Sequence, residues 1–209
     1  MAKRNKIKQS MENLYQIPDP WKSDSFYNQK KRKKQLNLIS KCKHDKILEV
    51  GCGEGFLTKE LAKICKTIDA IDISQNAILR AKKYCQGYKN IRFCCKNFIN
   101  FKPCKTKYDI ILLSEVFGYF LGELSFLDVG FLLERIIKSL KKKGVLIFVN
   151  TILHKKGISS EDKIVYYKWA RQAYYTILKE MDMKIVYNKQ FRGVKNNDLR
   201  KYEIIIFQK

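Results

Sequence analysis

The hydrophobic and polar positions of the chain follow two alternating periods. Short apolar runs, typical of buried strands, are separated by segments in which apolar residues recur every three or four positions, as on one face of a helix. The apolar runs predict strands at 46–50, 67–71, 90–95, 108–113, 145–149, 184–190 and 201–207. The helical spacing predicts helices at 25–40, 56–65, 74–85, 126–140 and 160–181.

This succession of elements predicts an α/β fold. Strand and helix alternate five times, which favours a Rossmann-like, mostly parallel sheet with helices on both faces. The last two strands, joined by a polar loop at 193–197, complete a seven-stranded sheet with a C-terminal antiparallel strand pair. We expect a basic N-terminal tail with a short helical tendency over residues 1–17, followed by a single domain over residues 18–209.

Composition narrows the class of protein. The chain has 209 residues, enough for one α/β domain, and no apolar stretch approaches the roughly 18 residues that span a bilayer. We therefore expect no membrane partner. Its seven cysteines are an odd number without the spacing of a zinc site, so we expect reduced cysteines, no metal site and a cytoplasmic location. The basic N-terminal residues lead into no apolar core, which argues against a secretory signal.

The net charge of +23 points toward a polyanionic partner such as RNA. However, only eight of the 43 basic residues are Arg, the type that base and phosphate recognition favours, and the lysines are spread along the whole chain. The densest run, Lys30–Lys34, falls in a predicted helix and is typical of a solvated face. The distribution of the basic residues therefore favours a compositional bias toward lysine as the origin of the charge. RNA binding through the basic surface stays open as an alternative.

The loop after the first predicted strand carries the strongest chemical signal. In Glu49-Val-Gly-Cys-Gly-Glu-Gly55, three glycines alternate with other residues on a strand-to-helix turn. Glycines let the backbone turn tightly and approach a ligand, and the following helix offers free N–H groups. Asp72 ends the second strand, where a Rossmann-type site places a carboxylate for two ribose hydroxyls. Together these features predict a nucleoside-containing ligand.

The run Leu48-Glu-Val-Gly-Cys-Gly-Glu-Gly55 resembles motif I of the class I S-adenosylmethionine-dependent methyltransferases. The likeness extends to Asp72, to the fourth-strand block at 108–116 and to the block at 140–149. It implies S-adenosylmethionine as the cofactor. It also implies cofactor contacts from Tyr27, Glu49, Gly51, Cys52, Gly53, Asp72, Ile73, Phe98 and Ser114.

Flanking segments resemble the nodulation protein S group, whose members N-methylate an amino sugar of a chito-oligosaccharide. The similar segments are Asp19-Pro-Trp21, Ser25-Phe-Tyr27 with the basic helix after it, and Leu113-Ser-Glu-Val-Phe-Gly-Tyr119. The resemblance implies that residues 18–44 form a cap and helix over the cofactor site, with Trp21 and Lys31 at the methionine end. Where that family usually has an acidic residue for the adenine amine, this chain has Asn97, whose amide oxygen also accepts a hydrogen bond.

Candidate residues for the methyl acceptor follow the fourth and fifth strands. Glu115 would hold an ammonium and take up its proton, His154 would act as a base or bind a hydroxyl, and Tyr119 would line the acceptor cleft with aromatic residues of the 160–181 helix. The chain lacks the Asn/Asp-Pro-Pro-Tyr/Phe block of enzymes that methylate base amines. We expect a methyltransferase for a small-molecule or saccharide amine, with N-methylation favoured over O-methylation. An RNA or protein methyltransferase recruited by the basic surface, and a non-catalytic nucleic-acid-binding module, are the alternatives.

Overall fold

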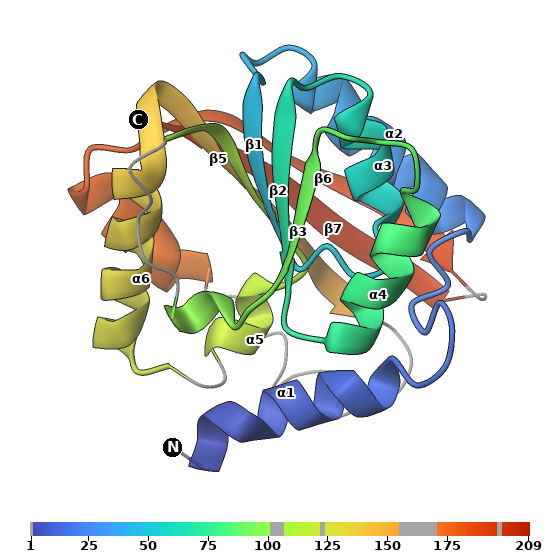
Figure 1. Ribbon diagram of the computed structural model, residues 1–209. Helices are drawn as coiled ribbons and strands as arrows, with labels where there is room; N and C mark the ends of the chain where they lie inside the picture. Colours follow the sequence, from blue (N-terminus) through green and yellow to red (C-terminus); the bar gives the residue numbers. More distant parts are fainter. Residues whose placement is uncertain (1, 101–106, 122–123, 155–170, 196–197) are drawn as a thin grey trace.

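The computed structural model describes residues 2–100, 107–121, 124–154, 171–195 and 198–209. They form a seven-stranded sheet in the order β3-β2-β1-β4-β5-β7-β6, with helices on both of its faces (Figure 1). The predicted Rossmann-like fold with its C-terminal antiparallel strand pair is confirmed. The strands are β1 (Lys46–Val50), β2 (Thr67–Asp72), β3 (Ile91–Cys95), β4 (Tyr108–Ser114), β5 (Leu140–His154), β6 (Lys184–Lys195) and β7 (Asp198–Gln208).

Strand pairing divides the sheet into two parts. The first five strands are parallel, with β1 at the centre between β2 and β4. β7 then pairs antiparallel with both β5 and β6. Because parallel strands point the same way, the carboxyl ends of β1 to β5 meet at one edge of the sheet. That edge is where ligands bind in open α/β sheets.

The helices among the described residues are α1 (Ala2–Leu14), α2 (Phe26–Ile39), α3 (Phe56–Ala62), α4 (Gln75–Tyr84), α5 (Phe117–Leu121) and α6 (Phe126–Ser139), with a 3-10 turn, η1, at Phe98–Asn100. Of these, α2, α3, α4 and α6 lie where the periodicity predicts helices, whereas α5 was not expected. Ser74 caps α4, because its hydroxyl accepts a hydrogen bond from the Ala77 N–H at 3.2 Å. Of the helix expected at 160–181, the described residues 171–180 are helical. No helix among the residues described is long and apolar enough to cross a membrane.

Alternating side chains of β4 join two cores, one on each face of the sheet. Ile111 and Leu113 pack with residues of α6, whereas Ile110 and Leu112 pack with residues of α3. All four are fully buried. A strand buried on both faces reads as a continuous apolar run, which explains why the sequence predicts β4 so clearly.

Two regions differ from the expectation. Where we expected a basic tail over 1–17, the chain forms helix α1, which crosses the edge of the sheet at which the parallel strands end (Figure 1). Tyr15, just after α1, is only 4% exposed. The domain boundary expected at residue 18 stays a prediction. The polar loop is also shorter than expected. We expected it over 193–197, but β6 and β7 pair as far as Lys195 and Asp198.

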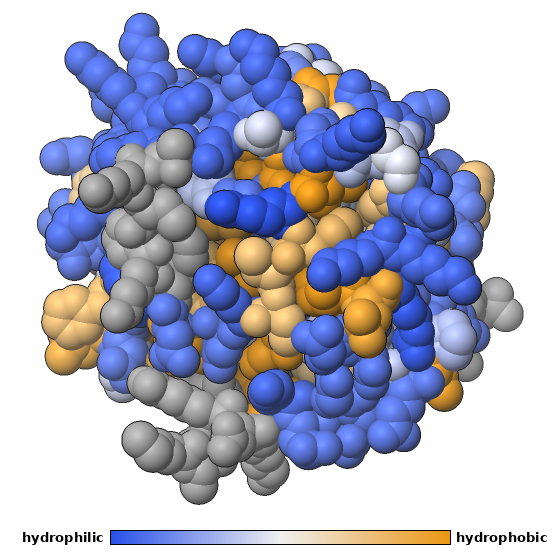
Figure 2. Space-filling model, in the orientation of Figure 1, coloured by the Kyte–Doolittle hydropathy of each residue, from blue (hydrophilic) through white to orange (hydrophobic). Residues whose placement is uncertain are grey.

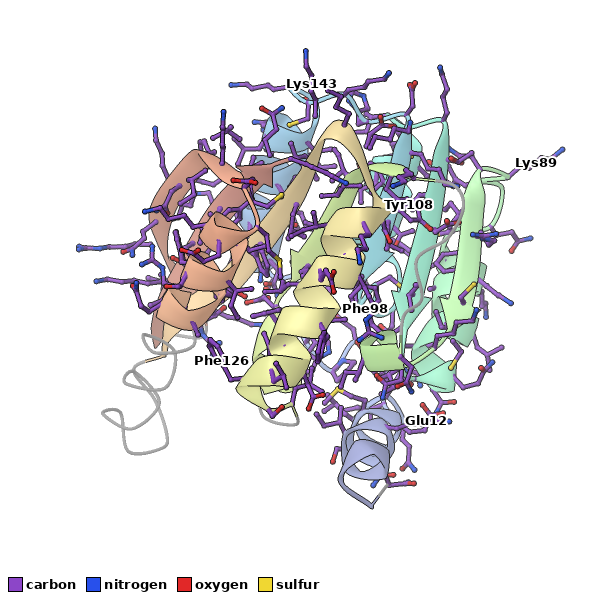
Figure 3. The ribbon with its side chains drawn as sticks, turned by 90° about the vertical axis from the view of Figure 1, so that its left-hand side faces the viewer. Glu12, Lys89, Phe98, Tyr108, Phe126 and Lys143 are labelled. Carbon is purple, nitrogen blue, oxygen red and sulfur yellow. The ribbon has the colours of Figure 1, made fainter. Side chains whose placement is uncertain are left out.

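Figure 3 shows the two ends of the sheet. Lys89 and Lys143, which precede β3 and the buried part of β5, lie at one end, and Glu12 of α1 lies at the other. Hydrophilic residues cover most of the face seen in Figure 2, with apolar side chains visible toward its centre. On this face, the hydrophilic side chains are thus spread widely and not gathered in one place.

Candidate functional site

The glycine loop forms the floor of a cleft at the carboxyl ends of the strands. Gly51 and Gly53 have φ angles of 74° and 53°, in the region that favours glycine. A Cβ on Gly51 would lie 2.0 Å from Cγ1 of Val116, and one on Gly53 would lie 2.8 Å from the Tyr15 hydroxyl oxygen. Both glycines are needed for conformation and for space, as the sequence predicts for a loop that approaches a ligand.

Asp72 is held rigidly beside this loop. Its carboxylate accepts hydrogen bonds from the Gly53 N–H at 2.8 Å and the Ser74 N–H at 2.9 Å, and the residue is 7% exposed. Burial raises the pKa of Asp72, and the backbone hydrogen bonds partly offset this rise. The carboxylate lines the cleft as a fixed acceptor, which suits vicinal hydroxyls of a ribose.

Glu49 is on β1, just before the glycine loop, and its environment differs from that of Asp72. It is 2% exposed, and one carboxylate oxygen accepts a hydrogen bond from the Thr58 hydroxyl at 2.6 Å. Burial raises the pKa of Glu49 to about 8, so the folded protein binds a proton there at neutral pH. The cleft thus has a carboxyl group in Asp72 that two backbone N–H groups hold in place, and a carboxyl group in Glu49 that is largely protonated at neutral pH.

The N-terminal segment closes one side of the cleft. The Trp21 indole N–H donates to the Tyr15 hydroxyl at 3.0 Å, and the Asp19 N–H donates to Glu54 at 2.9 Å. Glu54 also pairs with Arg80 of α4 at 2.7 Å. These contacts tie the segment before α2 to the glycine loop and to α4. They support the prediction that residues near Trp21 cover the ligand.

An ion pair crosses the cleft between α2 and the end of β4. Lys31 is only 6% exposed, and its ammonium pairs with the Glu115 carboxylate, which also accepts a hydrogen bond from the Thr151 hydroxyl. Burial acts to raise the pKa of Glu115, but the Lys31 charge and the hydrogen bonds from Lys31 and Thr151 outweigh it and lower the pKa. Glu115 is therefore an anion at neutral pH. Its φ of 58° places it in a strained backbone conformation of the kind that clusters at functional sites.

A second polar network reaches the cleft from β5. The Asn150 side-chain amide donates to the Tyr174 hydroxyl at 3.3 Å, and Tyr174 donates to Glu203 at 3.1 Å. Arg171 pairs with the same buried glutamate at 2.7 Å. Asn150 also lines the cleft, so this network reaches the cleft wall. Tyr174 belongs to the core, so this part of the aromatic acceptor wall that the sequence suggests is structural packing.

All the predicted cofactor residues line one cleft of about 560 Å³, within the usual range for small-molecule sites. Its lining includes Trp21, Tyr27, Lys31, Glu49, Gly51, Cys52, Gly53, Asp72, Ile73, Asn97, Phe98 and Ser114, together with Glu115 and Tyr119 of the predicted acceptor side. The roles that we assign to these residues stay predictions.

Asn97 and His154 differ from the other predicted site residues. Asn97 uses its amide oxygen to accept from the Ile99 N–H at 3.0 Å, so a second acceptor position of that oxygen would have to serve an adenine amine. His154 ends β5, and its side chain lies outside the described part of the structure, as do Tyr166, Tyr167 and Trp169.

Several residues that line the cleft could not be identified from the sequence. They include Ile7, Met11 and Tyr15 at the N-terminus, Gln35 of α2, Asn150 and Thr151 of β5, and Lys195 and Arg200 of the last two strands. The only local signal among them was the polar pair that follows the apolar run of β5. The others reach the cleft through tertiary contacts that no spacing reveals.

Comparisons with known proteins agree with the geometry. The model of the nodulation protein S (NodS) family matches residues 3–158. Nodulation protein S of Rhizobium tropici is 28% identical over 132 residues, which cover 62% of this chain and 54% of that protein. A malonyl-[acyl-carrier protein] O-methyltransferase of Acetivibrio thermocellus is 36% identical over 115 residues, or 54% of this chain and 38% of that protein. The matches thus span about half or less of these curated relatives' own length.

A solved structure is similar over almost the whole chain. It is the N-methyltransferase NodS from Bradyrhizobium japonicum WM9 in complex with S-adenosyl-L-homocysteine, with a TM-score of 0.75 and 23% identity. The superposition covers 96% of this chain and 97% of that one. At this level of identity, the likeness establishes the fold.

Proposed function

Because the chain belongs to the nodulation protein S family, we propose that it is an S-adenosylmethionine-dependent methyltransferase whose acceptor is a small-molecule or saccharide amine. The observation that carries the proposal is the pairing of the glycine loop with Asp72 in one cleft. The loop leaves no room for a Cβ at Gly51, and Asp72 is a buried acceptor whose backbone donors fix its orientation. These residues fit the amino-acid and ribose parts of the cofactor.

The sheet order separates the cleft into two halves. β1, β2 and β3 supply the glycine loop, Asp72 and Asn97, which would hold the cofactor. β4, β5, β7 and β6 supply Glu115, Asn150 and their neighbours, which would hold the acceptor. When bound, S-adenosylmethionine supplies a methyl group on a positively charged sulfur, so the protein mainly positions the acceptor and removes a proton.

Glu115 would bind the ammonium form of the acceptor. Its lowered pKa keeps the carboxylate ionised, which favours an electrostatic anchor for a cation. The amine must be neutral to attack, so its proton passes to Glu115 or to solvent before the nitrogen–carbon bond forms. The side chain of Asn150, which lines the cleft near Glu115, would help to orient the amine. This arrangement supports N-methylation over O-methylation.

No contact of the described residues specifically favours RNA or protein as the acceptor. The cations near Glu115 lie inside the cleft beside the proposed acceptor amine, so they do not form an extended surface track. We therefore retain the small-amine proposal.

The test is calorimetry with S-adenosylhomocysteine on the wild type and on Asp72→Ala. Removing the acceptor of two ribose hydroxyls leaves them unpaired in a partly dry site and should cost about 2–3 kcal/mol. We expect binding to weaken by about 30- to 150-fold. Asp45→Ala, which removes an exposed carboxylate paired with Lys66, is the matched control and should bind normally. Equal affinity of the wild type and a folded Asp72→Ala variant would contradict the proposal.

A further inference from the structure

We propose that Lys31 selects the acceptor, because its ammonium occupies the place on Glu115 that the acceptor ammonium must take and only another cation can displace it. This inference rests on the proposed function and names a specificity-determining residue of the same cleft. It starts from the fact that the carboxylate assigned to the acceptor already holds a cation. Lys31 and Glu115 both line the cleft, and they form the ion pair that crosses it.

Each oxygen of the Glu115 carboxylate accepts a hydrogen bond. Oε2 accepts from the Lys31 ammonium, and Oε1 accepts from the Thr151 hydroxyl. The Lys31 side chain is 7% exposed, whereas that of Glu115 is 38% exposed. Another cation, Lys195, is close enough to act on the charge of Glu115, but its ammonium donates to the Trp21 carbonyl oxygen at 2.7 Å. Lys31 is therefore the cation that an acceptor amine would meet on this carboxylate.

An acceptor ammonium is not readily added to this pair. Two ammonium groups on one carboxylate would leave a positive charge unmatched in a largely dry place, where like charges repel strongly. Replacing one ammonium with another keeps the net charge of the site unchanged. A neutral hydroxyl cannot make this replacement, because Glu115 would lose its counter-charge and gain only a neutral hydrogen bond. The ion pair thus discriminates against neutral oxygen acceptors in favour of cationic amines.

Gln35 offers the displaced Lys31 ammonium a second partner. It lies four positions after Lys31 on α2, so the two side chains are neighbours on one face of the helix. Gln35 is 2% exposed and lines the cleft, and its side-chain N–H group donates to the Ser114 hydroxyl at 3.4 Å. Its Oε1 is buried and has no hydrogen-bond partner among the described residues. Because a buried unpaired acceptor costs free energy, this oxygen favours a donor that moves to it.

These two partners give Lys31 two positions. The contact with Glu115 is the stronger one, because it joins opposite charges, whereas the Gln35 oxygen is neutral. Without an acceptor, Lys31 therefore stays on Glu115. When an acceptor ammonium reaches Glu115, it restores the charge balance there, and Lys31 turns to Gln35. The exchange lowers the affinity for every acceptor, but it lowers the affinity for neutral acceptors most.

The test compares glucosamine with glucose on protein saturated with S-adenosylhomocysteine, because the two sugars differ only in an ammonium and a hydroxyl at one carbon. Calorimetry measures both affinities at a pH at which glucosamine is a cation. In Lys31→Met, Glu115 has lost its resident cation, so glucosamine should bind about tenfold more tightly, whereas the affinity for glucose should change by less than about threefold. In Lys31→Arg, the guanidinium can pair through two N–H groups and is harder to displace, so glucosamine should bind more weakly.

Gln35→Leu removes the second partner of Lys31 and should weaken the binding of glucosamine more than that of glucose. With Lys31→Arg, it serves as the test if Lys31→Met does not fold.

The matched control is Lys33→Met, which removes an exposed cation of the same helix that does not line the cleft. It should bind both sugars as the wild type does. Unchanged or weaker glucosamine binding by a folded Lys31→Met variant, or wild-type glucosamine binding by both Lys31→Arg and Gln35→Leu, would overturn the inference and leave the ion pair a structural role. The initial titration with S-adenosylhomocysteine separates the proposals, because failure of the wild type to bind that ligand contradicts the proposed function itself.

Discussion

Replacing Glu115 with Gln tests the link between the ion pair and the transfer step. The substitution keeps the size of the side chain and one carbonyl oxygen but removes the charge that faces Lys31. Lys31 is 6% exposed, so its ammonium would lose its counter-charge in a largely dry place. Breaking a fully buried pair costs about 3–5 kcal/mol. The Glu115 side chain is 38% exposed, however, and screening by water reduces the cost to about 1–2 kcal/mol.

This cost predicts a moderate loss of stability. For a chain of this length, about 1–2 kcal/mol corresponds to a decrease of roughly 2–8 °C in the melting temperature. The affinity for S-adenosylhomocysteine should change by less than threefold, because Glu115 lies on the acceptor half of the cleft. Turnover should fall by about 10²- to 10⁴-fold, the usual contribution of a positioned acid or base. The combination of a small stability loss with a large turnover loss is the signature of an acceptor-binding carboxylate.

The assay follows methyl transfer to an amine as formation of S-adenosylhomocysteine, with melting temperature and cofactor affinity measured on the same preparation. Glu134→Gln is the matched control, since Glu134 forms an exposed ion pair with Lys138 on α6, away from the cleft. It should keep normal turnover. If Glu115→Gln retains more than a third of wild-type turnover, the residue only stabilises Lys31 and leaves the list of catalytic residues.

Two further predictions concern the floor of the cleft. Gly51→Ala should abolish measurable binding of S-adenosylhomocysteine, because its Cβ would overlap Val116, whereas Gly87→Ala, with a φ of 98° and no neighbour within 4 Å, should bind normally and lose only about 1–2 kcal/mol of stability. Normal binding by a folded Gly51→Ala would refute the close packing of the loop. Burial raises the pKa of Glu49 from 4.5 to about 8, so the proton it binds stabilises the fold below pH 4.5 and this contribution is lost as the pH rises to about 8. Urea unfolding between pH 5 and 8 should therefore show a decrease in wild-type stability that Glu49→Gln lacks, and parallel pH profiles would contradict the assignment.

Local patterns predicted the parts of the molecule that depend on neighbours in the sequence. The buried run of β4 and the glycine loop are examples, because burial on both faces and a tight turn each demand particular residue types at fixed spacing. Asp72 was also predictable, since the end of the second strand lies beside that loop in any sheet of this topology. The family resemblance, now confirmed, added the expectation that the segment near Trp21 would cover the site.

Contacts between distant residues were not predictable in this way. Lys31 stands in a run of basic residues that is typical of a solvated face, and the residues around it, such as Lys30 and Lys33, are indeed exposed. Only its place on the inner face of α2 brings it to Glu115, 84 positions later in the chain. The helical pattern of α1 is similarly weak, because its stability depends on packing against α4 and the cleft as well as on its own sequence.

The net charge of the chain and the chemistry of the cleft are separate properties, and the salt dependence of RNA binding tests the role of the charge. If the charge of +23 mainly reflects composition, mixed-sequence RNA should bind only in the nonspecific range of about 10⁻⁴ to 10⁻⁶ M at physiological salt. RNA that contacts six to ten phosphates should lose about 10³- to 10⁵-fold in affinity between 50 and 200 mM salt. Titrations of RNA at several salt concentrations measure this slope. A nanomolar RNA complex at 150 mM salt would show that the surface charge has a dedicated partner and would favour RNA as the acceptor.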